Sequence, residues 1–233
     1  MVTVLITGAN RGIGLALTRH YVESGARVIA CARDVDKAHE LARLAAHTGG
    51  QVTVASLDVT SEASVAALAC QLEGRPIDIL INNAGIGDYG RDGTDVLHLD
   101  YERLDLLIAV NAIGPARVCA ALYPNIKAGK EKKIVALTSR MASITNNTNG
   151  IIPAYRASKV MLNQLMRCLA ATARPDGVTV AVFHPGAVMT DMGGAGADVT
   201  PQESASGMAR VITAMTLAES GSFFNHKGEI LPW

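Results

Sequence analysis

The chain has 233 residues, and its 21 Lys and Arg balance its 21 Asp and Glu, so the formal net charge is zero at pH 7. A neutral charge argues against nucleic-acid binding, which needs a strong basic excess. A composition that is 49% hydrophobic and 18% charged excludes disorder over most of the length. The length predicts one domain with a large core, and two small domains are the alternative.

No apolar run approaches the ~20 residues that a membrane-spanning helix needs. Polar residues at 7–11 interrupt the first apolar run, so no signal peptide is predicted. The cysteines form no CxxC pair and no histidine stands at metal-ligand spacing from them, which predicts reduced thiols and no metal site. We therefore expect a cytoplasmic protein whose apolar excess lies in a sheet covered on both faces.

Two periodicities alternate along the chain. Short apolar, β-branched runs predict strands at 2–7, 27–32, 51–57, 77–81, 133–137 and 178–183, with a last one near 229–231. Helical spacing predicts helices at 12–24, 35–46, 61–72, 101–123, 153–173 and 201–217. This alternation predicts an α/β fold, a doubly wound parallel sheet (Rossmann fold) in a single three-layer α/β/α domain over residues 1–233. Loops at 85–99, 140–152 and 188–200 follow strands, so the ligand crevice should lie at the carboxyl edge of the sheet.

Three glycines stand between the first predicted strand and the first predicted helix. Gly8, Gly12 and Gly14 lie where the chain must turn sharply, a phosphate must approach backbone N–H groups and the helix must pack closely on the strand. A side chain would obstruct each of these steps. The segment therefore predicts a site for the pyrophosphate of a dinucleotide.

The end of the second predicted strand indicates which dinucleotide is bound. NAD-binding folds usually place Asp or Glu here to hold a ribose hydroxyl, whereas this strand ends in Ala32 and Arg33. Asp34 lies one or two residues beyond the usual position, and a register shift of that size would still allow NAD(H). Arg33 and Arg11 can instead bind the 2′-phosphate of NADP(H), which guanidinium groups recognise well. NADP(H) is therefore the predicted cofactor, and solvated surface arginines are the alternative.

Tyr155 and Lys159 are four residues apart at the start of a predicted helix, so they lie on one helix face. A nearby ammonium stabilises tyrosinate and lowers the pKa of a tyrosine, which makes it a usable acid or base. Such a pair is common by chance. Its significance here comes from other polar residues that are expected at the same edge of the sheet: Asp58, Asn82, Asn83, Asn111 and Ser139.

Together these motifs resemble those of the short-chain dehydrogenases/reductases over essentially the whole chain. The long stretch before Tyr155, the segment 155–159 and the ending 227–233 are similar to the branch that contains C-factor and the sniffer-type carbonyl reductases. The motifs that carry the resemblance are Gly8, Gly12 and Gly14, the segment 82–85, Asn111, Ser139, Tyr155 with Lys159, and Pro185-Gly186.

The resemblance implies a role for each of these residues. Tyr155 would protonate the carbonyl oxygen during reduction, or accept the proton during oxidation, and Ser139 would orient that oxygen. Lys159 would lower the pKa of Tyr155 and bind the nicotinamide ribose, while Asn111 would hold a water that links Lys159 to solvent. Asp58 would contact the adenine. The residues expected to bind the cofactor are Gly8, Asn10, Arg11, Gly12, Ile13, Gly14, Arg33, Asp58, Val59, Asn82, Asn83, Ala84, Gly85, Tyr155, Lys159, Pro185, Gly186, Val188 and Thr190.

One position departs from the family pattern. In most members the serine that orients the carbonyl lies closer to the tyrosine, at a position where this chain has Ala142. Ser139 keeps the place at the strand end with a longer loop behind it, and Ser143 is the competing candidate. Residues around 187–200, with glycines at 193, 194 and 196, are expected to form a small substrate lid.

The predicted function is the NADPH-dependent reduction of an aldehyde, ketone or quinone to an alcohol, or the reverse. The alternative is a dinucleotide-binding signalling protein of the C-factor type with little or no turnover. The complete set of Asn111, Ser139, Tyr155 and Lys159 favours the enzyme, because a sensor would have no need of it. The resemblance also implies a homodimer or homotetramer that takes a small carbonyl or alcohol substrate. The neutral charge and the short apolar runs predict no nucleic-acid or membrane partner.

Overall fold

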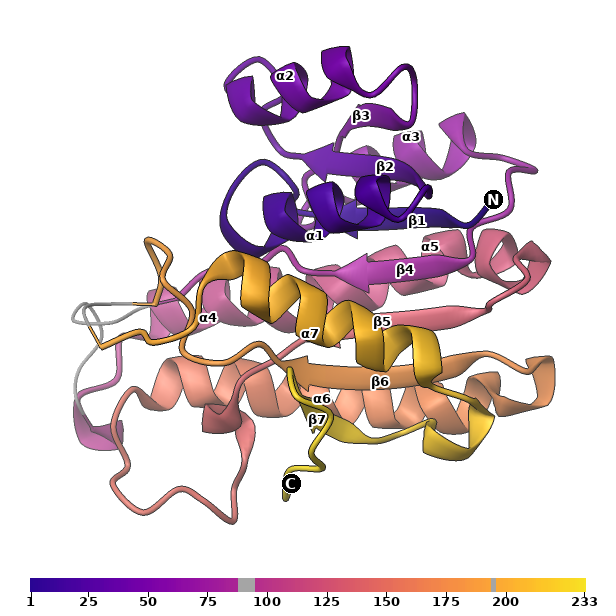
Figure 1. Ribbon diagram of the computed structural model, residues 1–233. Helices are drawn as coiled ribbons and strands as arrows, with labels where there is room; N and C mark the ends of the chain where they lie inside the picture. Colours follow the sequence, from indigo (N-terminus) through magenta and orange to yellow (C-terminus); the bar gives the residue numbers. More distant parts are fainter. Residues whose placement is uncertain (88–94, 194–195) are drawn as a thin grey trace.

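The computed structural model describes residues 1–87, 95–193 and 196–233 (Figure 1). The described residues form a seven-stranded sheet of order β3-β2-β1-β4-β5-β6-β7, in which each neighbouring pair is parallel. This topology confirms the predicted doubly wound sheet. The strands are β1 (Thr3–Thr7), β2 (Arg27–Ala32), β3 (Val52–Ser56), β4 (Ile79–Asn82), β5 (Lys133–Leu137), β6 (Thr179–His184) and β7 (Phe223–Asn225).

Helices cover both faces of this sheet. On one face, α1 (Gly12–Glu23), α2 (His39–His47) and α7 (Pro201–Ala214) pack on residues such as Val4 and Ile6. On the other face, α3 (Glu62–Gln71), α5 (Gly114–Ala128) and α6 (Pro153–Ala173) pack on residues such as Leu5. Figure 1 shows α1 and α7 in front of the strands and α5 and α6 behind them. Because both faces are buried, the central strands β1 and β4 are mainly apolar rather than alternating with polar residues, whereas the edge strand β3 has exposed Thr53 and Ser56.

The predicted helix 101–123 differs most from the structure. It consists of α4 (Tyr101–Ile108), a π-helical turn η2 (Ala109–Ile113) and α5, which continues to Ala128. Single π-helical turns are frequent at functional sites, and this one contains Asn111. The stretch Tyr101–Ala128 is also long and apolar enough to cross a membrane by length and composition, contrary to the sequence expectation. Its buried side packs into the core beneath the sheet, as in the core helix of a soluble protein.

The last strand was predicted at the wrong place. Burial decides its position, since Phe223 and Phe224 enter the cores on the two sides of the sheet. Residues 229–231 instead fold back, and Ile230 makes an isolated antiparallel bridge to Phe224. Two helices are also shorter than expected: α2 begins only at His39, and α7 ends at Ala214.

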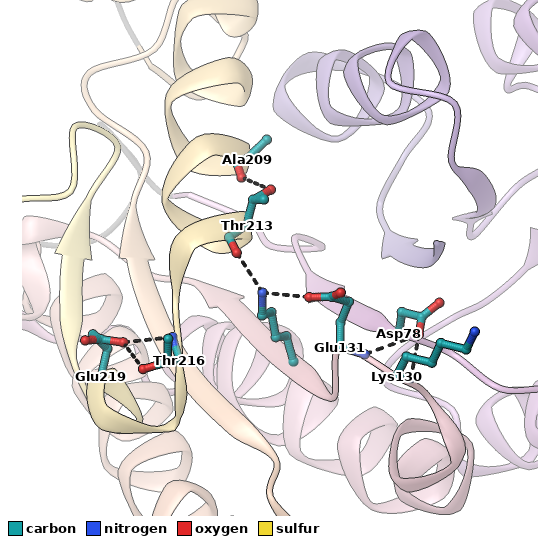
Figure 2. A network of polar contacts seen from close by, with 8 residues as sticks. Asp78, Lys130, Glu131, Ala209, Thr213, Thr216 and Glu219 are labelled. Atoms are coloured by element: carbon teal, nitrogen blue, oxygen red, sulfur yellow. Dashed lines mark hydrogen bonds and ion pairs between the residues drawn. The ribbon is translucent and has the colours of Figure 1, made fainter. Parts of the chain in front are cut away.

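The amino edge of the sheet is held by a polar network (Figure 2). The Asp78 carboxylate accepts hydrogen bonds from the backbone N–H groups of Lys130 (2.6 Å) and Glu131 (3.3 Å) just before β5. The buried Lys133 ammonium pairs with Glu131 (3.0 Å) and donates to the carbonyl of Thr213 (2.9 Å) near the end of α7. A cation at a helix C-terminus is stabilising. This network fastens the amino edge, and the candidate functional residues gather at the opposite edge.

Candidate active site

The loops that follow β4, β5 and β6 all leave the carboxyl edge of the sheet, on the left of Figure 1. β4 ends at Asn82, and the loop after β5 begins with Thr138 and Ser139. β6 ends at His184, directly before Pro185. Three of the predicted site segments are therefore neighbours, because their strands are adjacent in the sheet.

The glycine segment between β1 and α1 forms a close turn that excludes side chains. Gly8 and Gly12 have φ values of +64° and +52°, which other residues adopt only with strain. A Cβ atom on Gly14 would lie 2.2 Å from the carbonyl oxygen of Gly8. α1 begins at Gly12, so the first N–H groups of the helix lack intrahelical partners and face this turn. The segment thus has the shape and polarity that a pyrophosphate requires.

The loop after β4 holds the glycine segment in place. The hydroxyl of Thr7 accepts hydrogen bonds from the backbone N–H groups of Asn83 (3.1 Å) and Ala84 (2.9 Å). The side chain of Asn83 donates to the carbonyls of Thr7 and Gly8, each at 2.9 Å. The side chain of Asn83 therefore fixes the backbone of the glycine segment. Thr7 was missed by the sequence reasoning, although its place directly before the first glycine could have signalled it.

Two predicted cofactor residues turn their side chains into the core. Asn82 is buried, and its amide donates to the sulfur of Cys119 on α5 at 3.3 Å. Val59 is buried in the apolar core that also contains residues of β3 and α5. Asp58 lies nearer the surface, where hydrogen bonds from Thr60 hold the pKa of its carboxylate below the usual value.

The arginines predicted to meet a 2′-phosphate have different surroundings. Arg33 follows the end of β2, is exposed, and forms no ion pair within the described part of the chain. The neighbouring Asp34 carboxylate turns back to Lys37, with which it forms a salt bridge of 2.8 Å. Arg11 forms an ion pair with Asp191 in the loop after β6. Sequence reasoning could not find Asp191, since 180 residues separate it from Arg11 and no local pattern marks it.

The loop after β6 approaches the glycine segment. A Cβ atom on Gly12 would lie 3.2 Å from the methyl group of Thr190, and Val188 is buried. Gly186 has a φ of +94°, and the Pro185 carbonyl accepts a 2.6 Å hydrogen bond from Ser204 on α7. Residues 194 and 195 of the predicted lid lie outside the described residues.

Tyr155 and Lys159 lie on the buried face of α6, only 6% and 5% exposed. The Lys159 ammonium is 6.0 Å from the centre of the Tyr155 ring. It donates a 2.9 Å hydrogen bond to the carbonyl of Leu137, the last residue of β5. Burial lowers the pKa of Lys159 to about 8, because an ammonium loses hydration in this environment. The contact with Leu137 brings the pair on α6 against the strand end from which Ser139 follows.

Asn111 links the π-helical turn to two other parts of the site. It is fully buried, and its carboxamide accepts from the N–H of Ile86 (2.8 Å) and donates to the carbonyl of the same residue (2.9 Å). It also donates to the hydroxyl of Ser158 (3.1 Å), which in turn donates to the Tyr155 carbonyl (2.7 Å). A Cβ atom on Gly85 would lie 3.2 Å from the Asn111 oxygen and 3.5 Å from the Lys159 nitrogen. The loop after β4, the π turn and α6 therefore meet at one point.

The two candidate serines occupy the loop between β5 and α6. Ser139 accepts a hydrogen bond at its hydroxyl from the N–H of Met141 (3.1 Å) and caps the short 3₁₀ turn η3 (Arg140–Ala142). The Ser143 hydroxyl accepts from the N–H of Asn146 (3.2 Å). Each hydroxyl keeps its own proton to donate. Ser139 is 8% exposed and Ser143 1%, so Ser139 is the more accessible of the two.

The sequence matches the family model for short chain dehydrogenase over residues 2–199. The chain belongs to the short-chain dehydrogenase family. The C-signal protein of Myxococcus xanthus is 40% identical over 158 residues, which are 68% of this chain and 93% of the relative.

Two solved structures of similar proteins have the same fold. The NADPH-bound carbonyl reductase from chicken fatty liver is 32% identical, with a TM-score of 0.90 over 99% of this chain and 98% of the other. The carbonyl reductase Sniffer of D. melanogaster is 26% identical, with a TM-score of 0.92 over the whole of both chains. These similarities confirm the family resemblance deduced from the motifs, including its carbonyl reductase and C-factor branch.

Proposed function

We propose that this short-chain dehydrogenase is an NADPH-dependent oxidoreductase that interconverts an aldehyde, ketone or quinone with the corresponding alcohol. The observation that carries the proposal is the meeting of Tyr155 and Lys159 with the ends of β4 and β5, beside a glycine cradle. The NADPH bound to the similar chicken carbonyl reductase supports the choice of cofactor.

The cofactor would be held by the glycine segment, with its pyrophosphate at the N-terminus of α1. Arg33 would hold the 2′-phosphate. Arg11 would also bind this phosphate once its ion pair with Asp191 is broken. The loops 82–85 and 185–190 would flank the adenosine and nicotinamide ends. When bound, NADPH supplies the hydride, and the protein supplies position and polarisation.

The residues of the site carry the proton and orient the substrate. The Ser139 hydroxyl donates a hydrogen bond to the carbonyl oxygen, and Tyr155 transfers a proton to that oxygen as negative charge develops on it. The Lys159 ammonium stabilises the resulting tyrosinate, because opposite charges attract strongly in a buried site. With a pKa of about 8, Lys159 is mainly protonated at pH 7, so the required charge is present. The Asn111 side chain binds the Ser158 hydroxyl and so fixes the π turn against α6.

The proposal is tested by following NADPH absorbance with a panel of aldehydes, ketones and quinones. We expect turnover with at least one of them. The alternative is a signalling protein that binds the dinucleotide without turnover, which the similarity to C-signal favours. Tight NADPH binding with no oxidation by the whole panel would overturn the enzymatic proposal in favour of this alternative.

Cofactor preference is expected to depend on Arg33. Replacing Arg33 by Ala should lower kcat/KM for NADPH by about 10- to 100-fold, because a charge-assisted contact with the 2′-phosphate is lost. It should change kcat/KM for NADH by less than about threefold. The matched control is Arg27→Ala, since Arg27 is also exposed but begins β2 at the opposite edge of the sheet. Equal losses with both cofactors, or a wild-type preference for NADH, would contradict the assignment.

The two serines are separated by single substitutions. Ser139→Ala is expected to lower kcat by about 10²-fold, because the hydrogen bond to the developing oxyanion is lost. Ser143→Ala should lower it by less than about threefold and should act mainly on stability, since its hydroxyl accepts only within its own loop. Thermal denaturation separates the two effects. If Ser143→Ala alone abolished turnover, Ser143 would replace Ser139 in this role.

We further propose that residues around 187–200 close over the substrate as a small lid.

We also propose that the protein forms a homo-oligomer. The exposed apolar side chains of Tyr101, Leu106 and Ile113 along α4 and the π turn support this proposal. A dimer or tetramer would cover them.

A further inference from the structure

Arg156 follows Tyr155 on α6, and its side chain is nearly buried at 7% exposure. Its guanidinium is held by three acceptors from the loop between β5 and α6. It donates to the carbonyl of Ile151 (2.8 Å), to the side-chain oxygen of Asn149 (2.9 Å) and to the carbonyl of Met141 (3.3 Å). In the described part of the chain it has no carboxylate partner. A buried cation that is stabilised only by neutral oxygens needs those oxygens fixed in place, so Arg156 and the loop constrain each other.

The contact with Met141 connects Arg156 to the catalytic serine. The N–H of the same Met141 donates to the hydroxyl of Ser139, so Met141 is held on both sides. Its side chain packs against the apolar cluster that contains Tyr155 and Ile152. The position of the Ser139 hydroxyl relative to Tyr155 therefore depends on where Arg156 holds Met141.

The other end of the loop is strained. Ile152 has a φ of +48°, a conformation that a β-branched residue adopts only when its surroundings impose it. Arg156 holds both sides of this residue, because its guanidinium binds the carbonyl of Ile151 and its backbone N–H donates to the carbonyl of Ile152 (3.1 Å). The strain lies directly before the helix turn that carries Tyr155.

We propose that Arg156 is a positioning residue that fixes the loop 139–152 and thereby aligns Ser139 with Tyr155 for catalysis. It does not touch the reacting atoms. This inference rests on the proposed function for its kinetic consequence, whereas the anchoring of the loop stands independently of any activity.

The first test is hydrogen exchange of the full chain. In Arg156→Met we expect faster amide exchange confined to residues 140–152. The matched control is Arg167→Met, which removes another α6 arginine that donates to a loop carbonyl, that of Gly221, away from the site. It should leave exchange at 140–152 unchanged. Unchanged exchange of this segment in Arg156→Met would overturn the proposal.

The second test is kinetic and uses a double-mutant cycle with Ser139. Arg156→Met should lower kcat by about 10- to 100-fold, with NADPH affinity within about twofold of wild type, because misplacement of an orienting group acts on the chemical step. In a Ser139→Ala background the same change should cost less than about threefold. Arg156→Lys, which reaches fewer acceptors, should recover part of the loss.

Additive losses in the cycle, or equal losses in the Arg167→Met control, would overturn the alignment of Ser139 by Arg156. If no carbonyl compound of the panel supports NADPH oxidation by the wild-type protein, the proposed function is wrong. Faster exchange at 140–152 in Arg156→Met would then still support the anchoring, so the two failures are distinguishable.

Discussion

Replacing Tyr155 by Phe is expected to lower kcat by about 10²- to 10⁴-fold, because the substitution removes the hydroxyl that donates the proton. The ring is buried against Leu107, Ile152 and Ala154, and Phe preserves that packing. NADPH affinity should stay within about threefold of wild type. The measurement combines steady-state kinetics with a fluorescence titration of NADPH.

The matched control for this variant is Tyr123→Phe. Tyr123 lies on α5 and donates to Asp176 at 2.8 Å, away from the carboxyl edge of the sheet. Its loss should cost stability only, by about 1 kcal/mol. If Tyr155→Phe kept kcat within about threefold of wild type, the proton would have to come from another group, and the proposed mechanism would be wrong.

Lys159→Met should lower kcat by about 10²- to 10³-fold, because the tyrosinate loses its stabilising charge. The wild-type kcat/KM for reduction should also fall above a pH of about 8, as Lys159 loses its proton. The variant should lack this fall. A wild-type profile that stays flat through pH 9 would contradict the role given to Lys159.

The free energy of unfolding should rise with pH, whereas kcat/KM falls. The pKa of Lys159 is about 8 in the folded protein against 10.5 in the unfolded chain, so between these values the unfolded state binds more protons. The free energy of unfolding of the protein without cofactor should therefore rise with pH across this window, by up to about 3 kcal/mol relative to Lys159→Met. Urea denaturation of both proteins from pH 7.5 to 10.5 measures the difference. If the two proteins gave parallel profiles of unfolding free energy against pH, burial would not lower the pKa of Lys159.

The sequence predicted the local structure well wherever that structure depends on residue spacing within one element. The strands at 27–32 and 133–137 and the helix at 153–173 have the predicted boundaries, because Gly, Pro and turn residues delimit them. Tyr155 and Lys159 share a helix face, as their spacing required. The last strand was misplaced because 223–225 and 229–231 are both short and apolar, and only burial in the assembled core distinguishes them.

The contacts at the candidate site that the sequence did not predict join residues from different elements. The ion pair of Arg11 with Asp191 and the bonds of Arg156 to the loop are of this kind. So is the turn of the Asn82 side chain toward Cys119. Periodicity assigns a residue to a face of its own element, but it does not determine the register of that element against its neighbours.

The sequence by itself therefore determined the parallel α/β architecture, the neutral charge and apolar composition of the chain, the glycine turn and the Tyr155–Lys159 pair. Each of these follows from steric or periodic requirements within a few residues. The tertiary structure alone decided the π turn that buries Asn111, the anchoring of Lys159 at Leu137 and the hold of Arg156 on Met141. These depend on how packed helices and strand ends meet, because the free energy that places them comes from burial across the whole sheet.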